Sequence, residues 1–319
     1  MKKLFLLAFS ILPLPPSIMI KNLLFAVCLL LISLRSSGQD RTIDTLLQTR
    51  KTDSLIGKIK TYYSPGHKEI ASELQQLVSN AVTYYENKFH KRFDIQLIVL
   101  DSAQWFREVI PFGFVFYDQT HWLVLNTGMS YSDFKNVYGF NEIASQLDSS
   151  FSINHLRAEE IIYSRLKFLS LHELGHYFIS QISSAQPPDV WTNEFIATYF
   201  ANEYITQYEP KIKKGFDIFC RTIMKCYPAE YKTLAQFDSV YFRMKLGNFA
   251  WFHSRFYLLA DAIYSCSGNS YINIFEQNFP KKEGLIFKPE EISKLIEASC
   301  PGVFKKWDYT SISGVVPIH

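Results

Sequence analysis

The sequence predicts an α+β fold in which a small mixed sheet with helices is followed by a mainly helical half. Runs typical of strands lie between residues 94 and 126. From residue 154 onward, apolar residues recur mostly at helical spacing. No repeat, charge block or low-complexity linker interrupts residues 40–319, which favours a single domain.

The composition excludes several classes of protein. Apolar residues make up 48% of the 319 residues, which argues against a mostly disordered chain. The chain has 33 Lys and Arg against 30 Asp and Glu, but four of these bases lie in residues 1–38, which contain no acid. Taking 4 from 33 leaves 29 bases against 30 acids, a net charge of −1. A protein built to bind nucleic acid is therefore not indicated.

Residues 1–38 predict a signal peptide, and hence a periplasmic or secreted protein. Two short apolar runs end before Ser36 and Gly38, which suit the −3 and −1 positions of a cleavage site. Because Met19 and Lys21 begin a complete signal on their own, we expect Met19 to be the true start. The alternative is a membrane anchor, although the second run is short of the about 20 residues that a span needs. The protein would contact a membrane only if this segment stayed uncleaved.

The elements of the first half follow from the spacing of apolar residues. Residues 68–90 repeat them at helical intervals, and residues 94–101 (DIQLIVLD) predict a short buried strand. A short helix is expected at 102–109. Two further strands, joined by a turn, are expected at 112–117 and 121–126. Residues 39–66 precede the first clear helix, so a removable propeptide there stays open.

The second half is expected to be helical. Residues 154–182 have a helical period, a loop with two prolines follows at 183–189, and a second helix covers 191–208. The remaining chain is mostly helical in pattern. The predicted single domain, residues 39–319, thus consists of a sheet-containing half, 39–182, and a helical half, 183–319.

Four cysteines remain after the predicted signal: Cys220, Cys226, Cys266 and Cys300. An even number in an exported chain permits two disulfides. The local pairs Cys220–Cys226 and Cys266–Cys300 are favoured, and the alternative is four buried thiols. Their spacing is not that of a zinc ribbon.

Residues 172–176, His-Glu-Leu-Gly-His, form the motif that carries chemistry. On a helix, His172 and His176 lie one turn apart on the same face and can present two imidazoles to one metal ion. Glu173 projects beside that metal, where a general base acting on an activated water has to stand. The surrounding residues are apolar, and burying these groups without a partner would be costly. A shared zinc ion removes that cost.

A catalytic zinc ion needs a third protein ligand and an open position. No Cys lies near, and no His follows at the spacing of the metzincins. Glu194, the eighteenth residue after His176, stands near the start of the second helix. The loop at 183–189 would let this helix fold back along the first and bring Glu194 to the metal. These ligand types also suit other divalent metals.

The two motifs HELGH and WTNEFIATYF together resemble the gluzincin peptidases. They are most similar to the zinc aminopeptidases, whose signature is HExxH, a spacer and WxNEGFATYF. This resemblance implies a zincin-like catalytic domain in which His172, His176 and Glu194 bind Zn²⁺ and Glu173 is the general base. It covers about residues 165–202 of the chain.

The chain departs from the aminopeptidase pattern in three ways. The spacer is one residue shorter, and Phe195 stands where those enzymes carry Gly. The Gly-x-Met-Glu-Asn segment that holds the substrate's amine has no counterpart, the corresponding stretch being residues 121–129 (HWLVLNTGM). Aminopeptidase specificity is therefore not implied. An extended peptide could still pair with the edge of this strand.

Catalysis also needs a group that stabilises the oxyanion of the attacked carbonyl. In gluzincins this group is often a Tyr or His of the helical half, and Tyr241 is our first candidate. His253 and Tyr257 are further candidates, and each of the three could instead be an ordinary core aromatic. Asn193 and Thr198, from the second motif, are expected to support the metal ligands or line the substrate groove.

The sequence thus predicts an exported zinc metallopeptidase that acts on peptides or proteins. Neither its cleavage specificity nor its oligomeric state follows from the residues. The alternative is a non-catalytic relative that keeps zinc to hold two helices together and uses the groove for binding. Glu173 favours the enzyme, because a structural site needs no general base and is closed by four protein ligands. The sequence alone reveals no fourth ligand.

Overall fold

A mixed sheet is followed by a set of packed helices in the computed structural model, which confirms the α+β class. The structure describes residues 52–108, 115–117, 121–126, 156–182, 190–268, 272, 294–298 and 300–303. The predicted signal peptide, the loop at 183–189 and residues 127–129 lie outside the described residues.

The sheet has the strand order β1-β2-β3-β5-β4. The strands are β1 (Asp53–Leu55), β2 (Thr61–Tyr63), β3 (Gln96–Leu100), β4 (Val115–Tyr117) and β5 (Trp122–Asn126). β3 pairs in parallel with β2 and β5, whereas β4 is antiparallel to β5 and β1 to β2. Leu97 to Leu100 and all of β5 are buried, as expected of central strands covered on both faces. This confirms the predicted strand at 94–101 and the predicted pair after it.

Strands β1 and β2 were not predicted from the sequence, because three residues are too few to show an alternating pattern. β2 pairs with β3 from Thr61 opposite Leu97 to Tyr63 opposite Val99. Tyr63 is also part of the hydrophobic core. The sheet therefore includes residues that a propeptide extending to residue 66 would remove.

The helices follow the predicted ranges closely. They are α2 (Lys68–Phe89), α3 (Ser102–Glu108), α6 (Ala158–Ile182), α7 (Val190–Tyr208), α8 (Pro210–Cys226), α9 (Leu234–Val240) and α10 (Leu246–Ser267), with a 3₁₀ turn η1 (Tyr241–Arg243). Within the described ranges, none of these helices is both long and apolar enough to cross a membrane. Residues 130–146, for which the sequence predicts no clear element, lie outside the described residues.

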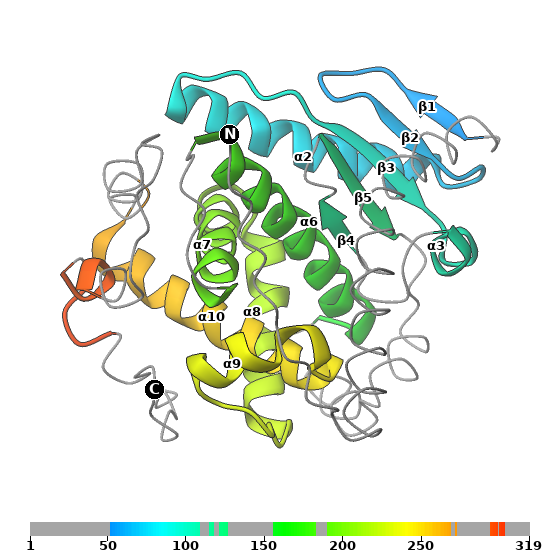
Figure 1. The fold of residues 1–319 in the computed structure, drawn as a ribbon. Coiled ribbons are helices and arrows are strands. Elements are labelled where there is room, and N and C mark those ends of the chain that lie inside the picture. Colours follow the sequence, from blue (N-terminus) through cyan, green and yellow to red (C-terminus); the bar gives the residue numbers. More distant parts are fainter. Residues whose placement is uncertain are drawn as a thin grey trace, which may run out of the picture. The chain divides into compact units, whose positions relative to one another are not determined.

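Helix α6 occupies the position between the sheet and the other helices (Figure 1). It contacts α2, β4 and β5 on one side and packs against α7 and α8. α10 in turn packs against α7 and α8, and α9 against α7. One continuous hydrophobic core joins these layers. The helix that carries the HELGH motif is therefore held by both halves of the domain.

The four cysteines are free thiols in the structure, which contradicts the predicted disulfides. Cys220 and Cys226 both lie on α8, six residues apart. That separation is about 9 Å along a helix axis, too far for a disulfide. Cys266 and Cys300 are neighbours whose side chains are hydrogen-bonded. Burial and this hydrogen bond raise the pKa of Cys300 to about 12.

Candidate metal centre

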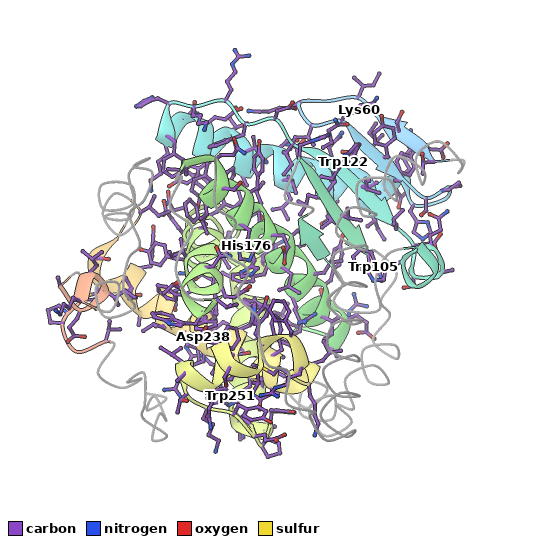
Figure 2. The ribbon with its side chains drawn as sticks, in the orientation of Figure 1. Lys60, Trp105, Trp122, His176, Asp238 and Trp251 are labelled. Carbon is purple, nitrogen blue, oxygen red and sulfur yellow. The ribbon has the colours of Figure 1, made fainter. Side chains whose placement is uncertain are left out.

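The candidate centre forms where α6 and α7 cross, and a glycine determines how closely they approach. A Cβ atom added at Gly175 would lie only 2.8 Å from the carbonyl oxygen of Ala197, so a side chain there would push the helices apart. The glycine within HELGH therefore brings the motif against the backbone of α7. Figure 2 shows His176 beside these two helices.

The two motif histidines direct their Nε2 atoms to one point. The Nε2 atoms of His172 and His176 are 3.1 Å apart, as the one-turn spacing predicts. His172 is fully buried, and its Nδ1 lies 3.1 Å from the hydroxyl of Thr198 on α7. Such a contact fixes the imidazole ring and leaves Nε2 for a metal. The position of Thr198 agrees with its predicted role as a support for the ligands.

Glu194 reaches the same point from near the start of α7. Its Oε2 is 3.1 Å from Nε2 of His172 and 3.6 Å from Nε2 of His176. The start of α7 is held by Asp238 of α9, whose Oδ1 accepts a hydrogen bond of 3.0 Å from the backbone N–H of Trp191. Sequence reasoning missed Asp238, because nothing in its local sequence indicates the helix that it caps. The structure thus brings together the three ligands implied by the resemblance.

The second oxygen of Glu194 is engaged by Tyr241 of η1. The Tyr241 hydroxyl donates a hydrogen bond of 2.7 Å to Oε1 of Glu194. The predicted oxyanion donor therefore lies at the centre, but its hydroxyl contacts a candidate ligand. Asn193 also supports the cluster, through a side-chain hydrogen bond with His176.

The general base predicted from the motif lies beside the histidines. A carboxylate oxygen of Glu173 and one nitrogen of each motif imidazole all lie within 4.8 Å of one another. Glu173 is half-buried, whereas Glu194 is buried. The two carboxylates thus differ in environment, one inside the cluster and one at its margin.

A third histidine enters the cluster from α10. Nε2 of His253 lies 3.4 Å from Oε2 of Glu194, and its ring centroid is 5.1 Å from that of His172. His253 is 8% exposed, and neither ring nitrogen has a hydrogen-bond partner in the part of the chain that the structure describes. The sequence had suggested His253 only as an oxyanion or groove residue.

Tyr257, one turn further along α10, does not line a groove, so that prediction is wrong. It is fully buried, and its ring packs edge-on against Phe168 and Phe216. Its hydroxyl accepts a hydrogen bond of 3.3 Å from Nζ of Lys213. Tyr257 is therefore an ordinary core aromatic, which was the alternative interpretation of each of the three candidates.

The charges of the cluster are strongly coupled. Burial by itself raises the pKa of Glu194, but the imidazoles of His176 and His172 hold that pKa well below its usual range. Burial lowers the pKa of His176, but the neighbouring Glu194 outweighs it and the pKa is about 9. For His253 burial dominates, and its pKa is about 3. One carboxylate is thus shared among three imidazoles.

This donor set fits a divalent cation such as zinc. With bonds of about 2.0–2.1 Å in a tetrahedron, neighbouring zinc ligand atoms lie about 3.3 Å apart. The three separations among His172, His176 and Glu194 are 3.1, 3.1 and 3.6 Å. Nitrogen and oxygen ligands of this kind are those that zinc accepts. The cluster could therefore hold a metal ion without a large rearrangement.

Comparisons with known proteins do not place this chain in a family. No family model, no curated protein and no solved structure matches it. The geometry of the cluster is therefore the basis on which a function can be proposed.

Proposed function

We propose that this protein is an exported metallopeptidase whose zinc ion is held by His172, His176 and Glu194. One observation carries the proposal. Three ligand atoms from two helices, separated by a loop in the sequence, converge at separations of 3.1–3.6 Å with the carboxylate of Glu173 beside them. This arrangement suits hydrolysis by a metal-activated water, and export follows from the apolar segment of the first 38 residues.

The ion would supply Lewis acidity, polarising the substrate carbonyl and lowering the pKa of a water to about 7. Glu173 would accept a proton from that water as its oxygen bonds to the carbonyl carbon. The same carboxyl group would return the proton to the amine as the carbon–nitrogen bond breaks. Thr198 would hold the ring of His172, and Tyr241 would hold Glu194.

The sheet offers a surface for an extended substrate. Among the described strands, β4 is one of the two edge strands, and it contacts α6, the helix of the motif. A peptide that paired with this edge would run alongside the helix that carries Glu173. Peptides or proteins are therefore the proposed substrates.

The second candidate function is zinc-stabilised binding without catalysis. The position of His253 favours it, because a structural zinc site is closed by a fourth protein ligand. Such a protein would hold α6, α7 and α10 together through the metal and bind partners without cleaving them. The presence of Glu173, which a structural site does not need, favours the peptidase.

Peptide-library cleavage, analysed by mass spectrometry, tests the proposal. Zinc-loaded protein starting at Gln39 is compared with Glu173→Gln and with Glu159→Gln, a control on the exposed first turn of the same helix. We expect Glu173→Gln to keep its zinc and lose about 100-fold or more of its activity, with Glu159→Gln unchanged. If zinc-containing wild-type protein cleaves nothing, the peptidase is rejected in favour of the binding function.

A further inference from the structure

We propose that His253 is a fourth protein ligand, which closes the coordination sphere of the metal in the resting protein. This inference rests on the metal centre of the proposed function and goes beyond its three ligands. The metal would then be held from three helices, with His172 and His176 on α6, Glu194 on α7 and His253 on α10.

The distance between His253 and Glu194 suits two ligands of one metal ion. Nε2 of His253 lies 3.4 Å from Oε2 of Glu194, which matches the about 3.3 Å expected between two ligands of a tetrahedral zinc ion. His172, Glu194 and His253 also form a group whose potential ligand atoms all lie within 4.8 Å of one another. His253 thus meets the same geometric criterion as the two histidines of the motif.

Burying the imidazole of His253 without a partner is unfavourable. Its two ring nitrogens are buried, and the described residues provide neither with a hydrogen bond. A buried polar group that is left unpaired loses its hydrogen bonds to water without replacement, which destabilises the folded state. Coordination through Nε2 would satisfy the nitrogen that points at Glu194.

Helix α10 and its neighbours hold the imidazole of His253 in place. His253 lies in the middle of α10, and the ring of Phe249 stands 4.1 Å from its ring, centroid to centroid. Phe256 packs edge-on against His253 at 6.1 Å, and α10 itself packs against α7. His253 is therefore presented to the metal by a packed helix.

Closure changes how the site would be used. A water or substrate carbonyl would have to enter as a fifth ligand, which zinc permits, or after His253 has left. Removal of His253 should therefore weaken metal binding while opening a position to small ligands. An oxyanion-stabilising His253 would leave both properties unchanged, so the two roles are distinguishable.

The test compares wild-type protein with His253→Ala and His253→Gln. Ser254→Ala is the matched control, because Ser254 is buried next to His253 and its hydrogen bonds, to the backbone oxygen of Ala250 and with Cys220, involve none of the candidate ligands. Zinc affinity is measured by competition with a chelator. Each protein is then loaded with Co²⁺ and titrated with azide while the visible absorption spectrum is recorded.

We expect both His253 variants to bind zinc about 10- to 100-fold more weakly, or worse, with Ser254→Ala unchanged. Their Co²⁺ spectra should differ from that of wild type and should respond to azide, whereas the wild-type spectrum should not. Equal zinc affinity and an azide response in wild type would overturn the inference. If wild-type protein binds no metal, the metal centre of the proposed function is rejected as well. If the protein cleaves peptides but its zinc affinity does not depend on His253, only the role of His253 as a ligand is rejected.

Discussion

The two oxygens of Glu194 face different partners, and this division organises the candidate centre. Oε2 points to the Nε2 atoms of the histidines, whereas Oε1 accepts the hydrogen bond of Tyr241. Residues that bond to a metal ligand in this way fix its orientation and its basicity. Tyr241 is therefore best regarded as a positioning residue for Glu194.

We predict that Tyr241→Phe weakens zinc binding about 10- to 100-fold, because Glu194 loses the contact that orients it. Chelator competition on purified protein measures the affinity. Tyr199→Phe is the control, since Tyr199 is also buried and donates one hydrogen bond, of 3.0 Å, to the backbone oxygen of Gly268. An equal zinc affinity for Tyr241→Phe and Tyr199→Phe would contradict the role. If Tyr241→Phe also kept turnover within about threefold of wild type, we would discard Tyr241 as a functional residue altogether.

At the scale of elements, the centre depends on how α7 is held against its neighbours. Phe195, which replaces the glycine of the aminopeptidase signature, is fully buried and packs edge-on against Phe256 of α10. Asp238 holds the start of α7, and Gly175 sets its distance from α6. Phe195 thus packs α7 against α10, the helix that carries His253.

We predict that Gly175→Ala lowers both the stability and the zinc affinity, because the new methyl group must displace the backbone of α7. Thermal unfolding and chelator competition measure the two effects. Gly215→Ala serves as the control: its Cβ would meet Ser164 at the contact of α6 with α8, away from the ligands. This control should be less stable with normal zinc affinity. Normal affinity in Gly175→Ala would show that the close crossing does not position Glu194.

At the scale of the whole molecule, the sheet and the helical half share one core, with α6 between them. Within that architecture the thiols are placed very differently. Cys220 is buried on α8, whereas Cys266 is exposed near the end of α10. No disulfide joins the described elements, so their packing must be maintained by burial of apolar surface and, in our proposal, by the metal.

We predict four reactive thiols in denatured protein that starts at Gln39 and is purified without reductant, as measured with a chromogenic thiol reagent. In the native protein Cys266 should react first, because it is exposed while Cys220 and Cys300 are buried. Cys266→Ser should remove this fast phase and leave the other thiols to react on unfolding. Two thiols or none in the denatured wild type would show that the protein forms disulfides after all.

The local features of this protein follow from its amino-acid sequence alone. The one-turn spacing of His172 and His176 needs only a helix, and apolar periodicity predicted that helix, its partner α7 and the strands of five residues. The three-residue strands β1 and β2 were missed, because β2 forms by pairing with β3 and β1 by pairing with β2, and neither leaves a periodic signal.

Which distant side chains meet depends on how the helices pack together. Glu194 was expected at the centre from the resemblance, but the hydrogen bond from Tyr241 and the approach of His253 depend on the packing of η1 and α10 against α7. Tyr257 shares the helix of His253 and is buried in the core instead. Helical spacing determines which residues share a face of one helix, whereas the contacts between helices follow from the packing of the whole core.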